Sequence, residues 1–191
     1  GSVEVIRKYE QWLTYWISEP DQGQSDAVNK GFSKGSGEIL GFLDSDDTYE
    51  PGALDTVGTY FLIHHETDVL FGNMNLADEH SRKVRRWLEV GFSKRRFVYG
   101  VSGVPQPAAF FRRSAFEGAG RLRNEFRCAL DSDLWLRMCL DGSTFRHVRK
   151  VFANFRLHSY SKTATLQEVV HAEEISLRKE LLNVDIESLS F

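Results

Sequence analysis

The sequence has little of several features that would place it in a specialised class. Its two cysteines, Cys128 and Cys139, are too few for a disulfide scaffold and lack metal-site spacing, so a reducing compartment is expected. No apolar run is long enough to span a bilayer, and no signal peptide is recognisable. The formal net charge of -3 argues against a protein that binds nucleic acid by bulk attraction. These absences favour a soluble cytoplasmic protein.

The composition is that of an ordinary globular chain. Hydrophobic residues make up 41% and charged residues 27% of the 191 positions, which suits one domain with a sizeable core. We expect this domain to cover residues 1–165. A capping box of Thr165 and Glu168 then predicts a C-terminal amphipathic helix over residues 166–191, with Leu177 and Leu181 on its apolar face.

The stretch around which the chain is organised covers residues 38–50 and reads EILGFLDSDDTYE. A short apolar run bounded by turn residues predicts a buried strand, parallel and central in its sheet. Open α/β sheets bind ligands beyond the carboxyl ends of such strands. There, Asp44, Asp46 and Asp47 offer hard oxygen ligands for a Mg²⁺ or Mn²⁺ ion that carries phosphates. A solvated turn is the alternative. An EF-hand is excluded, because Tyr49 stands where its glycine is required.

The order of predicted elements indicates an α/β fold. A helix over residues 3–11 is followed by an aromatic-rich strand at 12–17, a loop and a helix capped by Ser25. The acid-tipped strand comes next, so strand, helix and strand predict a right-handed βαβ unit. A core helix follows Pro51. Further strands are expected at residues 68–73, 108–111, 145–149 and 151–157, with a short helix from Ser114.

A basic and aromatic segment interrupts this pattern. Its basic residues alternate with large apolar ones: Arg82, Lys83, Arg85, Arg86, Trp87, Leu88, Phe92, Lys94, Arg95, Arg96 and Phe97. One interpretation is a solvated, mobile excursion. The other is a lip that touches an anionic acceptor or a membrane surface.

A helix starting near Asp131 carries the second group of acids. Its stripe of Leu134, Trp135, Met138 and Cys139 is predicted to be core, and Asp133 and Arg137, one turn apart, are predicted to pair on the exposed face. Asp131 itself is either the helix N-cap or a rigidly held catalytic base.

One histidine and one lysine follow the last predicted strand. His158 is either structural or a ligand that completes a carboxylate metal site, because a neutral imidazole binds the same divalent ions. Lys162 could meet a diphosphate. Neither residue decides between these alternatives by itself.

Five segments in sequence resemble the family 2 glycosyltransferases of the GT-A fold. They are SEPDQGQSDAVNKGF (18–32), GEILGFLDSDD (37–47), QPAAFFRRSAFE (106–117), LDSDLWLRM (130–138) and FRLHSYSKT (155–163). Together they cover most of residues 3–163, and the resemblance is greatest to bacterial enzymes that add sugars to exopolysaccharide, O-antigen or related glycans. It implies a Rossmann-like, mixed and mainly parallel sheet flanked by helices.

The resemblance also implies a metal and donor site. Asp44 and Asp46 match the DxD element, which reaches the nucleotide ribose and the Mn²⁺ or Mg²⁺ ion on the diphosphate, and Asp47 leaves open which pair does so. His158 matches a histidine near the diphosphate or metal. Asp21 and Gln24 lie in the loop that lines the nucleotide pocket, as Lys162 lies near the diphosphate.

Asp131 matches the family's general base, although Leu130 stands where the motif has a glutamate. The implied reaction is an inverting transfer from a nucleotide-diphosphate sugar, with a UDP-sugar as the default, to a glycan or lipid-linked acceptor. Nucleic acid is not an expected partner. The expected location is the cytoplasm, with the inner face of the membrane as the second candidate.

One departure from the family concerns the start of the chain. Family members begin with a strand, a helix and a second strand before the position of Gly1, so the chain is expected to be N-terminally incomplete. The acid-tipped strand should then expose an edge, covered by a second copy, or the chain should bind donors weakly. The alternative function is a catalytically impaired, self-associating module that retains the GT-A fold.

Overall fold

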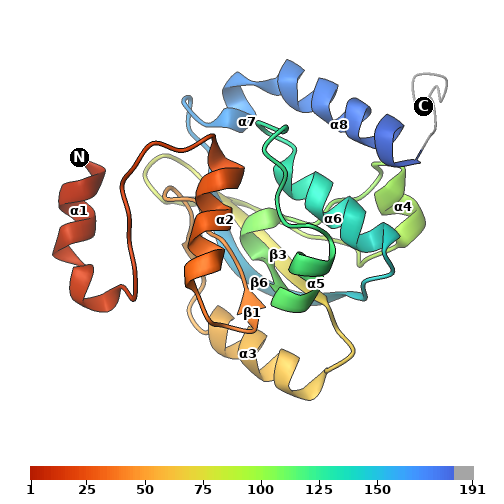
Figure 1. The fold of residues 1–191 in the computed structure, drawn as a ribbon, viewed down its shortest axis with the longest axis horizontal. Coiled ribbons are helices and arrows are strands. Elements are labelled where there is room, and N and C mark those ends of the chain that lie inside the picture. Colours follow the sequence, from red (N-terminus) through yellow and green to blue (C-terminus); the bar gives the residue numbers. More distant parts are fainter. Residues whose placement is uncertain (183–191) are drawn as a thin grey trace.

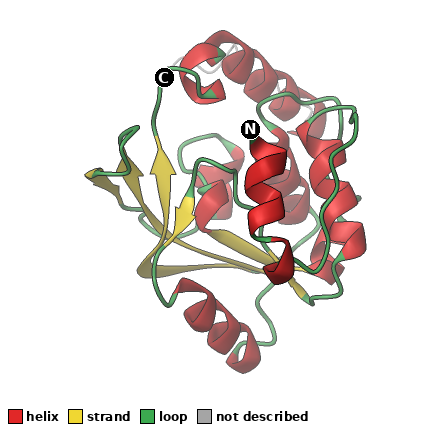
Figure 2. Cartoon of the chain, turned by 90° about the vertical axis from the view of Figure 1, so that its left-hand side faces the viewer, coloured by secondary structure: helices red, strands yellow, loops and turns green. Residues whose placement is uncertain are grey.

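The computed structural model describes residues 1–182 and shows one sheet with helices on both faces (Figures 1 and 2). The α-helices are α1 (Ser2–Lys8), α2 (Gln24–Lys34), α3 (Ala53–Ile63), α4 (Lys94–Val98), α5 (Arg113–Gly118), α6 (Leu130–Leu140), α7 (Lys162–Thr165) and α8 (Gln167–Leu182). The strands are β1 (Ile39–Leu40), β2 (Thr48–Tyr49), β3 (Val69–Ala77), β4 (Lys83–Trp87), β5 (Ala109–Arg112) and β6 (Phe145–Arg156). Two short 3-10 helices are η1 (Glu10–Trp12) and η2 (Gln106–Ala108).

The strands of the described chain follow the order β1-β5-β3-β6-β2, and β4 pairs with the C-terminal half of β3. Only β3 and β6 are parallel neighbours, because the other four pairings are antiparallel. The predicted mixed α/β sheet is therefore confirmed, but its pairings are mainly antiparallel rather than mainly parallel.

Strand β3 forms the centre of the core. Val69 and Phe71 point to one face of the sheet, where they pack with Trp135 and other residues of α2, α5, α6 and α8. Leu70 points to the opposite face, where it packs with Val57 and Phe61 of α3. Side chains alternate between faces along a strand, so a strand covered by helices on both sides is apolar throughout. Figure 1 shows α3 below the sheet, α6 and α8 above it, and α1 set apart at the left.

Strand β6 brings the C-terminal part of the chain to the acidic turn. Two strands were predicted at residues 145–149 and 151–157, but the structure has one strand that pairs with β3 along most of its length. Its far end pairs with β2, where Thr48 lies opposite Asn154. The turn before β2 and the loop after β6 therefore lie next to each other.

The predicted strand at residues 12–17 is wrong. Trp12 belongs to η1, and no strand follows it before α2. Trp12, Tyr15 and Ile17 are exposed. Aromatic and β-branched residues favour strands only where a neighbouring strand and a half-buried face receive them, and the described chain offers neither here.

The prediction of a central, parallel strand before Asp44 is also wrong. Strand β1 has two residues, lies at the edge of the described sheet and pairs antiparallel with β5. The predicted βαβ unit is also absent, because β1 has no parallel neighbour in the described sheet. An edge position for β1 agrees with the expectation that one side of this strand lacks a partner strand.

Helix starts differ from prediction in small ways. Helix α2 begins at Gln24 with Gly23 as N-cap, so Ser25 lies inside the helix rather than capping it. The side-chain cap near the C-terminus is Ser161, which accepts a hydrogen bond from the backbone of Ala164 at the start of α7. Helix α8 packs into the main core through buried Leu177. The part of the predicted helix beyond residue 182 lies outside the described residues.

Candidate active site

The turn of residues 44–47 is fixed to the end of β6 by Asp47. Its Oδ1 accepts a hydrogen bond of 2.8 Å from the backbone N–H of Arg156. Asp47 is buried, and burial raises the pKa of its carboxyl to about 6. The predicted role of Asp47 in cofactor binding is not supported by its position, because the side chain is used inside the fold. This placement leaves Asp44 and Asp46 as the pair that faces outward.

Asp46 meets His158 across this junction. The distance between Asp46 Oδ2 and His158 Nε2 is 2.9 Å, and His158 lies two residues beyond the end of β6. The contact is partly exposed. The structure thus brings together two predicted metal ligands that lie 112 residues apart in the sequence.

Asp44 is connected to Lys162 through Gln24, the first residue of α2. The Gln24 side-chain amide donates to Asp44 Oδ1 at 2.9 Å, and Lys162 Nζ donates to Gln24 Oε1 at 2.6 Å. Burial, together with the charge of Asp46, raises the pKa of the Asp44 carboxyl, while Lys162 opposes that rise. A cation placed here would relieve the repulsion between the two carboxylates.

Asp131 lies in the first turn of α6, but it is not the helix cap. The N-cap is Ala129, and the backbone N–H groups just before the helix donate to Glu173 of α8. The Glu173 carboxylate accepts hydrogen bonds of 2.9 Å from the backbone N–H groups of Arg127, Cys128 and Ala129. The N-cap alternative for Asp131 is therefore wrong, and its carboxylate remains available to a ligand.

The electrostatic surroundings of Asp131 favour a base. Burial raises the pKa of the Asp131 carboxyl to about 6, and the charges of Glu174 and Asp44 add to this rise. A carboxylate with a pKa nearer to neutrality is a stronger base and is still mainly ionised at pH 7.

Asp133 of the same helix has a structural position, because it is fully buried in ion pairs of 2.6 Å with Arg123 and Arg137. The predicted Asp133–Arg137 pair is confirmed, but it is buried rather than exposed.

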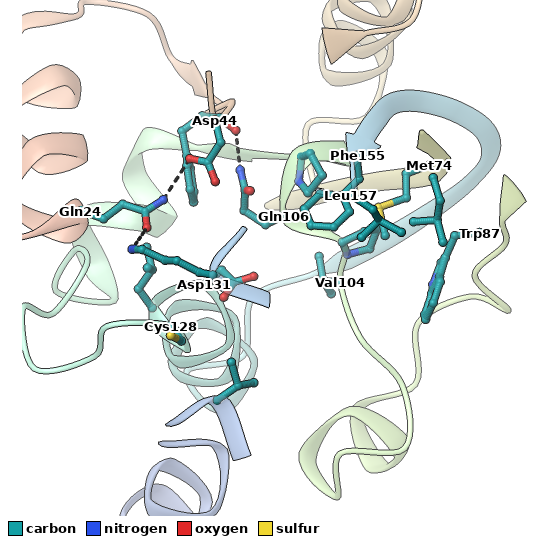
Figure 3. Close-up of a pocket in the computed structure, with 17 residues that line it drawn as sticks. Gln24, Asp44, Met74, Trp87, Val104, Gln106, Cys128, Asp131, Phe155 and Leu157 are labelled. Atoms are coloured by element: carbon teal, nitrogen blue, oxygen red, sulfur yellow. Dashed lines mark hydrogen bonds between the residues drawn. The ribbon is translucent and has the colours of Figure 1, made fainter. Parts of the chain in front are cut away.

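Two adjoining cavities connect these groups. A cavity of about 490 Å³ is lined by Gln24, Asp44, Lys162 and Asp131, and Figure 3 shows Asp44 and Asp131 on opposite sides of it. A second cavity of about 410 Å³ is lined by Asp46 and His158, and it shares Gln24, Asp44 and Lys162 with the first. Residues from four separate segments therefore line two adjoining cavities.

One predicted site residue lies elsewhere. Asp21 is exposed, lines neither of these cavities, and accepts a hydrogen bond from the backbone of Gly23.

Glu173, which shapes the start of α6, was missed by sequence reasoning. No local pattern identifies it, because the N–H groups that it caps lie more than forty residues earlier in the chain.

The basic and aromatic segment is divided between core and surface. Phe92 stacks on Phe145 with a centroid distance of 4.3 Å, and Phe97 is buried. Strand β4 is exposed along its whole length, and Trp87 at its end lines the larger cavity. The interpretation as a wholly solvated excursion is therefore wrong, and two of the aromatic residues assigned to a lip belong to the core.

Asp44, Asp46 and His158 fit a divalent ion whose remaining coordination positions are filled by a bound ligand. In residues 1–182, no three His, Cys, Asp or Glu side chains converge closely enough to hold a metal ion by themselves. Asp46 and His158 are in contact, with Asp44 nearby in the same turn. Mg²⁺ commonly takes one or two carboxylates and completes its shell with phosphate oxygens and water. This donor set is consistent with an ion that binds together with a diphosphate.

Comparison with protein families identifies the chain. The model of Glycosyl transferase family 2 matches residues 1–120, which is more than half of the sequence. The chain belongs to glycosyl transferase family 2. The match includes the turn with Asp44 and Asp46, and it ends before Asp131 and His158.

Curated relatives of this family 2 chain carry glycosyltransferase names. An uncharacterized glycosyltransferase of Mycobacterium tuberculosis is 30% identical over 145 residues, covering 72% of this chain and 52% of the relative. A PGL/p-HBAD biosynthesis glycosyltransferase of Mycobacterium bovis is 28% identical over 140 residues, with the same coverage of 72% and 52%. The chain thus spans about half the length of these curated relatives.

Solved structures share its fold. Residues 1-349 of TarS of S. aureus, in complex with UDP-GlcNAc, superpose with a TM-score of 0.68 at 18% identity, covering 99% of this chain and 61% of that TarS chain. The mannosyltransferase PcManGT from Pyrobaculum calidifontis, in complex with GDP-Man and Mn²⁺, superposes with a TM-score of 0.64 at 14% identity, covering 94% and 50%. These likenesses confirm the predicted GT-A fold.

Within residues 1–182, no helix has the length and apolar character needed to cross a membrane.

Proposed function

We propose that this family 2 chain takes part in an inverting transfer of a sugar from a nucleotide-diphosphate donor to an acceptor hydroxyl. The observation that carries the proposal is the shared cavity of Asp44 and Asp131, joined to the Asp46–His158 pair. One end of the site offers groups for a diphosphate and a cation, and the other offers a base. A displacement that inverts the anomeric carbon is assisted by both, because the base activates the hydroxyl and the cation stabilises the leaving diphosphate.

The donor diphosphate is assigned to the cavity next to Lys162. Lys162 supplies positive charge there, and Gln24 holds its ammonium group in place. A Mn²⁺ or Mg²⁺ ion would be held by Asp46, His158 and Asp44, and when bound it would neutralise charge on the leaving diphosphate. The structural likeness to proteins that bind UDP-GlcNAc, or GDP-Man with Mn²⁺, supports a nucleotide-sugar donor. A UDP-sugar is the default donor.

Asp131 is assigned as the base that removes the proton of the attacking hydroxyl. With a pKa of about 6, its carboxylate is ionised at pH 7 and accepts a proton more readily than an ordinary aspartate. The hydroxyl oxygen then attacks the anomeric carbon from the side opposite to the leaving group. The acceptor is a glycan or a lipid-linked saccharide.

The proposal is tested by heating the protein with UDP, with and without Mn²⁺. A ligand at a hundredfold excess over its dissociation constant stabilises a fold by about 2.7 kcal/mol. We expect a rise in Tm that needs both UDP and Mn²⁺ and that is lost in Asp46→Ala. Asp21→Ala is the matched control, because Asp21 is an exposed acid outside both cavities. A rise that persists in Asp46→Ala, or no rise at all, contradicts the proposed donor site.

The edge position of β1 favours a second candidate role, that of a self-associating module. Within the described chain, β1 pairs only with β5, so its other side is available to a second copy. Sedimentation analysis distinguishes the two roles, because a module of this kind is a dimer without UDP-dependent stabilisation. Val84 of basic β4 is exposed, as are Leu88 and Val90 just after this strand, and we propose this surface for a membrane contact.

A further inference from the structure

The larger cavity has two chemically different halves. Of its lining residues, only Asp44, Asp131 and Lys162 are charged, and all three lie toward the end with Gln24. Figure 3 shows the opposite end, which is formed by apolar side chains. These are Met74, Leu76, Trp87, Val104, Leu157 and Phe155, of which Phe155 also lines the second cavity, beside Asp46 and His158.

The apolar half is built from three neighbouring strands. In the sheet register, Met74 of β3 lies opposite Trp87 of β4, and Leu76 of β3 lies opposite Phe155 of β6. Met74 and Leu76 are two residues apart, so they point to the same face of the sheet. Leu157 extends this row just beyond the end of β6. The result is one continuous apolar wall.

This wall is in contact with water. Trp87 is 42% exposed and Leu157 is 43% exposed, while Met74, Leu76 and Phe155 are partly exposed. Apolar surface that gathers in a concave site next to reactive groups is typical of a ligand pocket rather than of a protein interior. The wall therefore fits an apolar ligand group.

Hydrogen bonds hold Trp87 in position. Its indole N–H donates to Glu89 Oε1 at 2.8 Å, and the backbone N–H of Glu89 donates to Asn73 Oδ1 at 2.9 Å. Asn73 is buried, and its Oδ1 also lies 3.0 Å from His147 Nε2. A side chain held in this way loses little conformational freedom when a ligand binds.

The wall does not suit the polar donor. Phosphates and sugar hydroxyls lose their hydrogen bonds to water when they are placed against apolar side chains, and this loss opposes binding. The donor is assigned to the charged half, so the apolar half is left for the acceptor. We propose that the wall of Met74, Leu76, Trp87, Phe155 and Leu157 binds an apolar aglycone, an alkyl or aryl group attached to the saccharide whose hydroxyl faces Asp131. This inference rests on the proposed function, since it names the acceptor class of the same site.

The test is a calorimetric titration of the protein, without donor, with three glucosides that differ only in their aglycone. They are the methyl, hexyl and phenyl β-D-glucopyranosides. Full burial of a side chain as large as leucine or phenylalanine contributes about 1.5–3 kcal/mol, which corresponds to roughly 10- to 150-fold in affinity. We expect the hexyl or the phenyl glucoside to bind at least about tenfold more tightly than the methyl glucoside. A preference for hexyl identifies an alkyl aglycone, and a preference for phenyl identifies an aryl one.

Two variants assign the preference to the wall. Trp87→Gln lies in β4 and Leu157→Gln lies just beyond β6, and each should reduce the preference for the apolar aglycone. Trp12→Gln is the matched control, because Trp12 is 77% exposed and does not line the cavity. Equal binding of all three glucosides, or a preference that survives both cavity variants, overturns the inference. So does an equal loss for all three glucosides in Trp87→Gln, because that result indicates stacking of the sugar itself.

The donor measurement separates this inference from the proposed function. UDP with Mn²⁺ should raise the Tm of Trp87→Gln as much as that of the unaltered protein, because the donor groups lie at the other end of the cavity. If UDP stabilises the protein but the glucosides show no preference, the donor site stands and the aglycone site is wrong. If the preference is found without any effect of UDP, the apolar site stands and the donor assignment is wrong.

Discussion

Replacing Asp131 by asparagine should make the fold more stable at neutral pH while removing transfer. Asp131 lies in the first turn of α6 and is partly buried, and burial raises the pKa of its carboxyl to about 6. The protein therefore carries a charge in an unfavourable place. Asparagine has nearly the same shape, and its amide oxygen can still accept a hydrogen bond from the backbone. The substitution thus removes the charge and little else.

The sign and size of the effect follow from the two pKa values. The folded-state pKa, about 6, lies above the ordinary value of 3.8, so between these values the folded protein holds its proton more tightly than the unfolded chain. The free energy of unfolding therefore falls as the pH rises through this range. About two pKa units correspond to about 3 kcal/mol, which we reduce to about 2 kcal/mol because the carboxylate reaches cavity water. For a chain of this size, about 2 kcal/mol raises the Tm by about 4–8 °C.

The assay is a pair of thermal melts, at pH 4 and at pH 7.5, for the unaltered protein and for Asp131→Asn. The variant should melt higher at pH 7.5, and the difference should nearly vanish at pH 4, where the buried carboxyl is protonated. Asp21→Asn is the control, since Asp21 is exposed and outside the cavities. A variant that is no more stable at pH 7.5, or whose added stability is the same at both pH values, would refute this reasoning.

Three further predictions concern the same helix. Asp133→Asn should lower the free energy of unfolding in urea by about 3–5 kcal/mol, because it leaves Arg123 and Arg137 without their buried carboxylate. A change below about 1 kcal/mol would show that other acceptors replace this carboxylate. Glu173→Ala should lower the free energy of unfolding by about 1–3 kcal/mol and also lower kcat, because it leaves the N–H groups before α6 without their acceptor. An unchanged kcat would show that Glu173 does not position Asp131. The rate of transfer should rise with pH through about 6 as Asp131 ionises, and a rate that is flat between pH 5 and pH 7 would argue against this base.

Features encoded by short patterns could be predicted from the sequence. The apolar stripe of α6, including Trp135 and Met138, is buried as its helical period indicates. The acids at Asp44 and Asp46 face a cavity, as a short apolar run followed by carboxylates indicates. In both cases the residues that decide the outcome lie within one turn or one strand of each other.

Features that depend on distant partners could not be predicted. Residues 12–17 have the composition of a strand, but no strand lies beside them, so they stay irregular. The different roles of Asp46 and Asp47 follow from the pairing of β2 with β6, which places His158 beside one acid and the N–H of Arg156 beside the other. Adjacent residues with identical side chains cannot be distinguished by a local pattern.

Trp87 illustrates the same limit at the cavity. In the sequence it is one aromatic residue among many basic ones, and that pattern leaves open a solvated excursion or a lip that touches an acceptor or a membrane. Its position opposite Met74 in the β3–β4 pairing turns it toward the site. The cavity wall that we assign to the acceptor therefore becomes recognisable only when the strand register is known.

The most direct test of the account is a crystal structure of the protein with UDP and Mn²⁺, in which anomalous scattering locates the metal. We expect manganese in contact with Asp46 and His158, the diphosphate beside Lys162, and the open side of the diphosphate facing Asp131. Manganese bound away from Asp46, or a diphosphate outside the cavity that Asp44 and Asp131 share, would contradict the account.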